Sequence, residues 1–263
     1  MAKYSQHQSR RAAKVLITGD NGAGKSACLA SLANAGYELF IIDFDNGLDI
    51  LRSYLHPGAE DRIHYHTFRD DPSQVKATAW KDAYSVTTKG WKFDNEDCGK
   101  PWEWPDNHVL VVDSLTFGTR QVGHHILTLN NRKITEQVSL PEWGAVNREL
   151  TAFLDRITGD DYGSVIVTAQ PVNVDDENGV SRVYPHIGTK NYSMEVAGFF
   201  NTSIGIKTGK QNKRVLQLVG STRQEFKTSV APVPPEVEIP NPGDPNYGYA
   251  KLFSVLKKES SYA

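Results

Sequence analysis

Short runs of aliphatic residues, each bounded by glycine or polar residues, divide the chain into a series of predicted strands. Four of these runs are apolar almost throughout, which is typical of strands buried on both faces of a parallel sheet. A further run, Arg62–Phe68, alternates polar and apolar residues as a half-buried strand does. The four apolar runs are the one that begins at Lys14, Leu39–Asp43, Val109–Ser114 and Ser164–Ala169.

Helical periodicity is clearest over Pro141–Thr158, which opens with proline and closes near Gly159. Together with the strands, this pattern predicts an α/β fold: a mainly parallel sheet flanked by helices, with an antiparallel hairpin near the C-terminus. The shorter predicted elements are helices over Leu48–Leu55 and Tyr247–Lys258, and the hairpin of Phe199–Lys207 with Arg214–Gly220.

We expect a single main domain over residues 14–230, preceded by a basic arm (1–13) and followed by a Pro-rich arm with a short terminal helix (231–263). Residues 85–107 belong to a Trp-rich stretch that predicts a surface insertion. Pro171–Ser193 is polar and rich in turn formers, which predicts a long loop. Six prolines between residues 231 and 246 predict extended, irregular chain.

Composition narrows the class of protein. The 263-residue chain has a net charge of −2, so its overall charge does not indicate a nucleic-acid binder. Two cysteines, Cys28 and Cys98, indicate neither a disulfide framework nor a zinc site. The basic first residues lack the apolar segment of a signal peptide, and no run approaches the roughly 18 apolar residues of a membrane span. We therefore expect a cytoplasmic protein with no membrane partner.

The turn after the first strand carries the strongest candidate chemistry. It satisfies the G-x-x-x-x-G-K-[ST] (Walker A) pattern, in which backbone N–H groups surround phosphates. A helix predicted from about Lys25 would add the positive end of its dipole. We expect Lys25 to contact the β and γ phosphates of ATP and Ser26 to ligate Mg²⁺. The expected nucleotide-binding residues are Gly19, Asn21, Gly22, Ala23, Gly24, Lys25, Ser26 and Ala27.

Two other predicted strands end in carboxylates. Val109–Ser114 leads into Asp113 in the form of a Walker B strand, whose aspartate holds Mg²⁺. The strand that ends at Asp43 is followed by Asp45, Asn46 and Gly47. This tip is either a carboxylate site in the crevice at the carboxyl ends of the strands or only a turn, because Asp, Asn and Gly are common turn formers. Spacing alone leaves both interpretations open.

Two basic stretches are candidates for binding anions. Phe117–Lys133 carries Arg120, Arg132 and Lys133 and no acid, so it is either a contact surface for DNA or the solvated face of a helix. Between Lys207 and Lys227, six basic residues stand against one acid. The candidates there for a cation that reaches the nucleotide of a neighbouring protomer are Lys210, Lys213, Arg223 and Lys227.

These motifs together resemble the RecA-like branch of P-loop ATPases, and more narrowly the phage-encoded RecA-like proteins of single-strand annealing recombination. The resemblance covers about Lys14 to Lys227. It rests on GDNGAGKS from Gly19, IIDFDNGLDIL from Ile41, VLVVDSLT from Val109 and VIVTAQ from Val165.

The resemblance implies roles for three residues at strand ends. Asp45 would orient the attacking water, Asp113 would hold Mg²⁺, and Gln170 would sense the γ-phosphate and lead into a loop that contacts DNA. It also implies single-stranded DNA as a partner, a homo-oligomeric ring or filament, a phage single-strand-binding protein as a further partner, and the host cytoplasm as the location.

The expected function is therefore DNA-stimulated ATP hydrolysis in phage recombination. Two alternatives stay open. A small-molecule or nucleoside kinase also uses a P-loop, and the basic stretch Lys207–Lys227 could supply its lid. A nucleotide-gated binding module with little hydrolysis is the other alternative, because Asp45 is one methylene shorter than the Glu usual at that position in the family.

Overall fold

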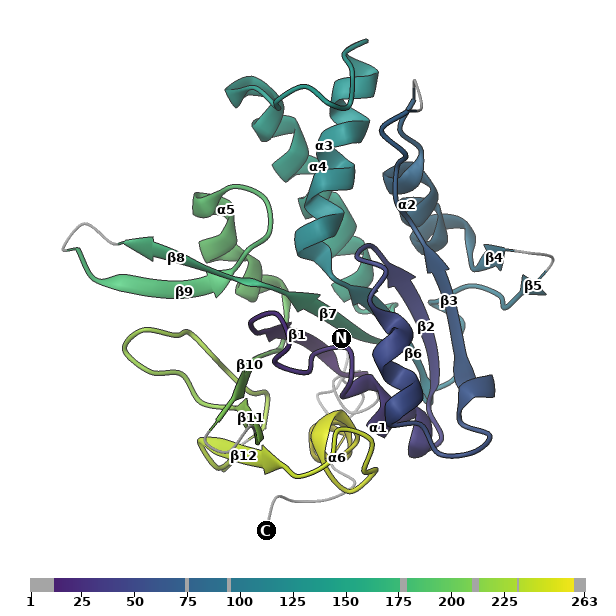
Figure 1. Cartoon of the computed structure of the whole chain (residues 1–263), viewed down its shortest axis with the longest axis vertical. Coiled ribbons are helices and arrows are strands. Elements are labelled where there is room, and N and C mark those ends of the chain that lie inside the picture. Colours follow the sequence, from purple (N-terminus) through teal and green to yellow (C-terminus); the bar gives the residue numbers. More distant parts are fainter. Residues whose placement is uncertain are drawn as a thin grey trace, which may run out of the picture.

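The computed structural model describes residues 12–73, 76–93, 96–175, 179–209, 213–230 and 232–257. One eight-stranded sheet forms its centre (Figure 1). Its strands are β1 (Lys14–Thr18), β2 (Glu38–Asp43), β3 (Ile63–Thr67), β6 (His108–Asp113), β7 (Ser164–Ala169), β10 (Thr202–Thr208), β11 (Arg214–Gln217) and β12 (Glu236–Ile239).

The strand order is β12-β11-β10-β1-β7-β6-β2-β3. The strands from β10 to β3 run parallel, while β11 and β12 extend the sheet in antiparallel pairing. The predicted α/β fold, with a mainly parallel sheet and antiparallel strands near the C-terminus, is confirmed. Two further ribbons are β4 (Lys92–Phe93) with β5 (Glu96–Asp97), and β8 (Pro171–Asp175) with β9 (Ser181–Pro185).

Helices cover both faces of the sheet, and alternate residues along a strand belong to the apolar clusters on the two faces. Val15 and Ile17 belong to an apolar cluster with α1 and α6, whereas Leu16 belongs to a cluster with α2, α3 and α4. The helices are α1 (Leu29–Asn34), α2 (Ala79–Lys89), α3 (Leu115–Leu129), α4 (Leu140–Thr158), α5 (Lys190–Glu195) and α6 (Gly248–Leu256), with 3₁₀ turns over Leu48–Ser53, Glu60–Arg62 and Val196–Phe199.

Helix α4 forms where its periodicity predicts it. Ser139 and Glu142 make a reciprocal capping box at its start, with Pro141 in the first turn. Its apolar stripe is fully buried and includes Leu150 and Phe153. This stripe packs on α2 and α3 and joins the three helices in one apolar layer.

The Trp-rich stretch is not confined to the surface as expected. Its first part is helix α2, whose buried residues follow helical spacing. Trp80 and Trp91 are 1% and 2% exposed, and both belong to the core layer of α3 and α4. The predicted insertion, 85–107, therefore supplies core side chains as well as the small β4-β5 ribbon.

Two segments expected to be irregular are ordered elements. The predicted long loop over 171–193 contains the β8-β9 hairpin and α5. The Pro-rich segment supplies β12, a proline-free edge strand between Pro235 and Pro240 that pairs with β11. The N-terminal arm falls outside the described residues except for its last two.

The C-terminal helix packs on the helix that follows the phosphate loop. The N–H of Ala250 donates to Oγ of Ser31 at 3.2 Å, and Nδ2 of Asn34 donates to the carbonyl of Gly243 at 2.6 Å. Helices α1 and α6 thereby share one apolar cluster. Within the described ranges, no helix has the length and apolarity needed to cross a bilayer.

Candidate active site

The candidate residues meet at one edge of the sheet because parallel strands end there together. Thr18 is in register with Ala169, and Asp43 with Asp113. The N–H of Gly19 then continues the ladder to the carbonyl of Ala169 at 3.1 Å. The phosphate loop, the end of β6 and the end of β2 therefore share the crevice at the carboxyl ends of the strands.

The loop itself has the backbone of an anion cradle. Gly22 and Gly24 have φ angles of 77° and 103°, which favour glycine. Gly19 has no room for a side chain, because a Cβ there would lie 2.5 Å from the carbonyl oxygen of Ile206. Within the described part of the chain, none of the N–H groups of Gly22, Gly24, Lys25, Ser26 and Ala27 donates a hydrogen bond. Unpaired donors converging on one loop are what a phosphate requires.

The helix after the loop begins later than predicted. It was expected from about Lys25, but α1 spans Leu29–Asn34. Between them the backbone makes tighter i to i+3 bonds, such as Leu29 N–H to Ser26 carbonyl at 3.0 Å. The turn between the phosphate loop and α1 is thus wound mainly with 3₁₀-type bonds. The hydrogen-bond donors for a phosphate are therefore the N–H groups of the loop and not the end of a regular α-helix.

Lys25 reaches back across the loop. Its Nζ donates to the carbonyl oxygens of Gly19 at 2.6 Å and Asp20 at 3.0 Å. Burial lowers the pKa of Lys25, and the negative charges of Asp113, Asp45 and Asp20 act in the opposite direction. A phosphate chain on the loop would give this buried ammonium charged acceptors in place of neutral carbonyls.

Asp113 is fully buried beneath the loop. Its Oδ2 accepts a hydrogen bond from Oγ of Ser26 at 2.6 Å, and its Oδ1 accepts one from Oγ1 of Thr168. Burial raises the pKa of Asp113, and the hydrogen bonds from Ser26 and Thr168 act in the opposite direction. A hydroxyl beside a buried carboxylate is a hard oxygen donor set, which fits the Mg²⁺ expected at Ser26 and Asp113.

The two carboxylates at the end of β2, Asp43 and Asp45, differ in their hydrogen bonds. Asp43 is buried and accepts from the N–H groups of Asp45 at 3.2 Å and Asn46 at 2.8 Å, and from Oγ1 of Thr67 at 3.1 Å. Oδ1 of Asp45 is buried without a partner among the described residues. Burial, reinforced by the charges of Asp113 and Asp43, raises the pKa of Asp45 to about 6. Asp43 therefore holds the turn, and Asp45 is the carboxylate left for other chemistry.

Gln170 joins the phosphate loop to α3. Its Nε2 donates to Oδ1 of Asn21 at 2.9 Å, and its N–H donates to Oγ1 of Thr116 at 2.9 Å. Its carbonyl accepts from the N–H of His186 at 2.7 Å. The side chain thus lies beside the loop, and its expected contact with a γ-phosphate stays a prediction.

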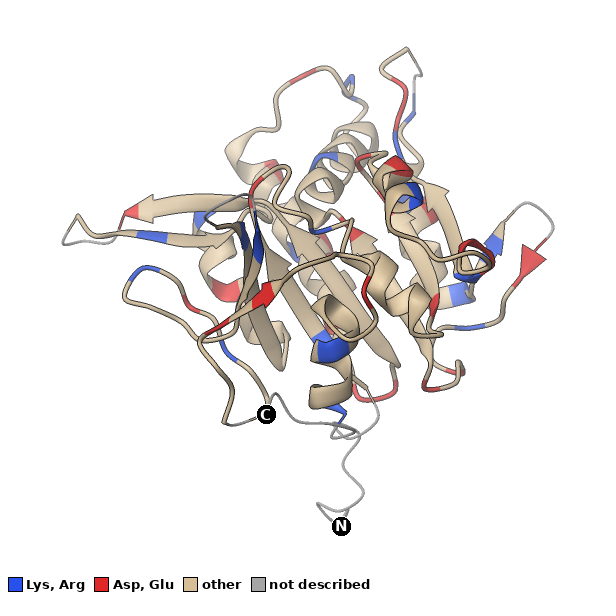
Figure 2. Ribbon diagram, turned by 60° about the horizontal axis from the view of Figure 1, so that its bottom comes forward, with Lys and Arg blue, Asp and Glu red and all other residues tan. Residues whose placement is uncertain are grey.

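The basic residues expected to bind DNA lie in different surroundings. Arg120 is exposed, and its guanidinium carbon lies 5.5 Å from the ring centroid of Phe117. Arg132 donates to Glu136 at 3.0 Å and to Glu142 at 2.5 Å, so its charge is largely compensated. Lys133 is exposed. Basic and acidic residues are interspersed along the ribbon (Figure 2).

The cations expected to act on a neighbouring protomer are spread over the C-terminal part of the chain. Lys213 forms an ion pair with Glu238 at 2.7 Å. Arg223 and Lys227 lie on the segment that binds back to β9 and β10 through backbone hydrogen bonds. Lys210 lies outside the described residues. Their action between protomers stays a prediction.

Two residues of the site were not predicted. Thr168 interrupts the apolar run of β7 two positions before Gln170, and a polar residue in such a run is a signal that could have been used. Arg214 lies against Gly24 of the loop. The basic stretch around Arg214 contains several equivalent candidates, so the sequence offers no signal that selects this one.

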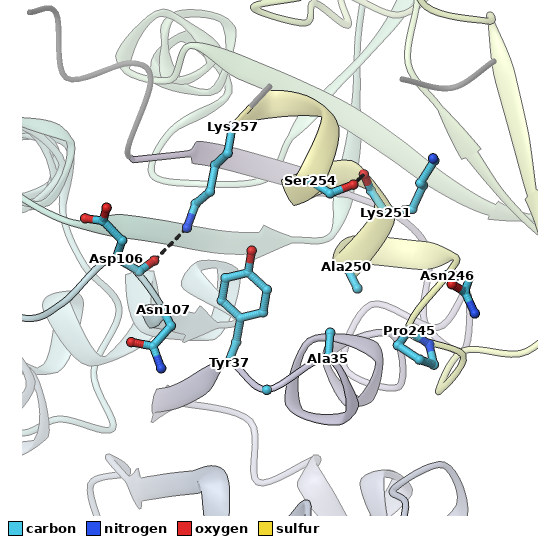
Figure 3. A pocket seen from close by; sticks show the side chains of 11 residues that line it. Ala35, Tyr37, Asp106, Asn107, Pro245, Asn246, Ala250, Lys251, Ser254 and Lys257 are labelled. Atoms are coloured by element: carbon cyan, nitrogen blue, oxygen red, sulfur yellow. Dashed lines mark hydrogen bonds between the residues drawn. The ribbon is translucent and has the colours of Figure 1, made fainter. Parts of the chain in front are cut away.

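A separate cavity of about 550 Å³ lies at the far end of α1, between that helix and α6 (Figure 3). Nζ of Lys257 donates to the carbonyl of Asp106 across its rim at 2.6 Å, and lies 4.9 Å from the ring centroid of Tyr37. None of the residues that line it belongs to the phosphate loop.

Comparison with known proteins places the chain in a family. No curated protein matches it. A family model described as an AAA domain matches residues 11–230 and so includes the phosphate loop and all strands from β1 to β11. An AAA domain implies binding and hydrolysis of a nucleotide, which agrees with the loop, Lys25 and the pair of Ser26 with Asp113. The chain belongs to this family of P-loop AAA domains.

Proposed function

We propose that the protein hydrolyses ATP with Mg²⁺ at the phosphate loop. The observation that carries the proposal is the convergence of Lys25, the bonded pair Ser26 and Asp113, and the unpaired Oδ1 of Asp45 at one edge of the sheet. These groups supply a cation for phosphate oxygens, ligands for a metal, and an acceptor for the attacking water. Positioning and electrostatic stabilisation of this kind account for most phosphoryl-transfer catalysis.

In the proposed reaction, the oxygen of water bonds to the γ-phosphorus while the bond from that phosphorus to the bridging oxygen breaks, which releases ADP and phosphate. The carboxylate of Asp45 accepts a hydrogen bond from the attacking water and fixes its direction. Lys25 moves its hydrogen bonds from the loop carbonyls to phosphate oxygens. Mg²⁺, held by Ser26 and Asp113, would add positive charge beside the β and γ oxygens.

Phosphate release from ATP, measured with Mg²⁺ and with EDTA, tests this proposal. We expect turnover that requires Mg²⁺ and produces one phosphate per ADP without any added acceptor. Tight ATP binding without turnover would instead favour the nucleotide-gated binding module. Turnover that depends on an added small-molecule acceptor would favour the kinase.

We further propose that single-stranded DNA is the macromolecular partner and that the protein works as a homo-oligomer in phage annealing recombination. Gln170 supports this, because it bonds both Asn21 of the loop and Thr116 at the start of α3. Phe117 and Arg120 follow within one helical turn. A guanidinium over an aromatic ring suits both the phosphates and the bases of a single strand, so occupancy of the loop could bias DNA binding.

Fluorescence anisotropy of a labelled oligonucleotide across a salt series tests the DNA proposal. We expect tighter binding with ATP than with ADP, and a slope of log affinity against log salt that loses about 0.7 in Arg120→Ala, as for one phosphate contact. Arg148→Ala, which removes an exposed arginine of α4, is the control and should keep the wild-type slope. Absence of binding, or an unchanged slope in Arg120→Ala, would contradict the proposed surface. A sizing run with ATP tests the oligomer.

A further inference from the structure

Arg214 reaches the phosphate loop from two strands away. It opens β11, in register with Thr208 of β10 and Ile239 of β12. A Cβ added to Gly24 would lie 2.4 Å from Nε and 2.5 Å from Cδ of Arg214. The stem of Arg214 therefore rests directly on the loop backbone, in the space that glycine leaves open.

The guanidinium has no anionic partner among the residues that the structure describes. Nε of Arg214 is buried and makes no hydrogen bond, and the residue forms no ion pair within the described part of the chain. The guanidinium carbon lies 5.7 Å from the ring centroid of Tyr54. This cation–π contact stabilises the positive charge, but it does not supply an anion. By contrast, the neighbouring Lys213 and Lys207 are paired with Glu238 and Glu236.

A buried hydrogen-bond donor without a partner destabilises the folded state, and arginine keeps its charge at any physiological pH. The position is therefore costly unless a ligand completes it. The ligand must be an anion that lies on the loop N–H groups, within reach of a planar group held at Gly24. Phosphate meets both demands, because its oxygens accept the paired N–H bonds of a guanidinium.

We infer that Arg214 binds the phosphate chain of the nucleotide held by its own loop. This inference rests on the proposed nucleotide binding and adds a second cation to Lys25 from the same chain. Nucleotide binding then does not depend on assembly of the homo-oligomer, because one protomer supplies both cations that hold ATP. Any cation from a neighbouring protomer then serves turnover rather than affinity.

Competition against a fluorescent ATP analogue tests the inference, with ATP and inorganic tripolyphosphate as competitors and with dilute protein. We expect Arg214→Gln to weaken both competitors by the same factor, about 10- to 100-fold, as for loss of charged hydrogen bonds. Arg214→Lys should recover part of the affinity for both. Arg148→Ala removes an arginine elsewhere and should bind like wild type, and thermal melting should show that every variant is folded.

Unchanged tripolyphosphate affinity in folded Arg214→Gln would overturn the inference, and if ATP alone were weakened, Arg214 would contact the base or ribose instead. If the wild-type protein bound neither competitor, the proposed nucleotide binding itself would be wrong, which is a distinct result.

Mixing Arg214→Gln protein with Lys25→Ala protein tests whether Arg214 acts in its own chain or on a neighbouring protomer. Both residues serve one site in one chain, so we expect no recovery of ATP turnover. Recovery would mean that Arg214 acts on a neighbour.

Discussion

Oγ of Ser26 donates a 2.6 Å hydrogen bond to Asp113, a residue 87 positions further along the chain. This bond connects the phosphate loop to the end of β6 and joins two oxygen donors that both suit Mg²⁺. The register of the sheet therefore brings the two halves of the site together, and substitutions at either partner should separate nucleotide binding from metal-dependent chemistry.

Asp113→Asn should retain much of the nucleotide affinity but lose Mg²⁺-dependent turnover. The amide keeps the shape of the side chain and can still bond the hydroxyls of Ser26 and Thr168, but it removes the negative charge that attracts the cation. Binding of a fluorescent ATP analogue and phosphate release measured across a Mg²⁺ titration would check this. Turnover at the wild-type Mg²⁺ midpoint would remove Asp113 from the metal site.

Lys25→Ala should weaken ATP binding and abolish turnover. Lys25 is 8% exposed, and without its ammonium the phosphate charge loses a buried compensating cation. Calorimetric titration with ATP and a turnover assay are the measurements. Wild-type turnover in Lys25→Ala would refute the assignment of the phosphate loop.

Asp45→Asn and Asp43→Asn should fail in different ways. Asp45→Asn should bind ATP and hydrolyse it about 10²- to 10⁴-fold more slowly, the usual contribution of a positioned proton acceptor. Asp43→Asn should lower the melting temperature, because a neutral amide oxygen accepts the N–H groups of Asp45 and Asn46 more weakly than the carboxylate does. If Asp43→Asn were stable and slow while Asp45→Asn were active, the roles of the two carboxylates would be exchanged.

Turnover should fall as the pH drops through about 6, because the pKa of Asp45 is raised to about 6 from its ordinary 3.8. The stability of the fold changes with pH in the opposite direction. The folded state holds this proton more tightly than the unfolded state, so ionised Asp45 opposes folding above pH 6 and the effect is relieved as the pH falls. Asp45→Asn should therefore raise the melting temperature of the ligand-free protein at pH 7.5, and its advantage should shrink below pH 6. An equal advantage at both pH values would contradict the shifted pKa.

Trp80→Ala should destabilise the fold by about 3 to 5 kcal/mol, as large-to-small changes of buried aromatics do. Trp80 is 1% exposed and lies with its ring centroid 5.0 Å from that of Phe153. Leu140→Ala, at an 88% exposed position, should change the free energy of unfolding by less than about 0.5 kcal/mol. Denaturant unfolding of both variants would test whether the Trp-rich stretch is core. Equal midpoints would contradict its burial.

The sequence predicted those parts of the molecule that contiguous residues encode. The strand before Asp113 is an unbroken aliphatic run, and the phosphate loop needs only eight neighbouring residues. Helix α2 could also have been found from its buried positions, such as Ala79, Ala83 and Val86, which repeat with helical spacing. The prolines and most of the tryptophans lie after that pattern, and they drew the prediction towards a surface insertion.

Other features depend on residues that meet only in the fold. Whether Asp43 or Asp45 holds the turn is decided by Thr67 on the neighbouring strand, and the contact of Arg214 with Gly24 crosses β10. The ion pairs of Arg132 depend on the capping box that starts α4. The contacts of Thr67 and Arg214 require the sheet order and the strand register, which no local pattern carries.

The packing of α6 on α1 has a consequence for synthesis. Ser31 leaves the ribosome early, but its partner Ala250 follows 219 residues later. At about 5 to 20 residues per second, the delay is roughly 10 to 45 seconds. Throughout this interval the helix behind the phosphate loop lacks the surface that covers it in the finished protein, as Arg214 is also absent for most of it. A nascent chain thus carries the complete motif for holding a nucleotide well before it has the support to do so, and capture of ATP should follow the synthesis of α6 rather than that of the phosphate loop.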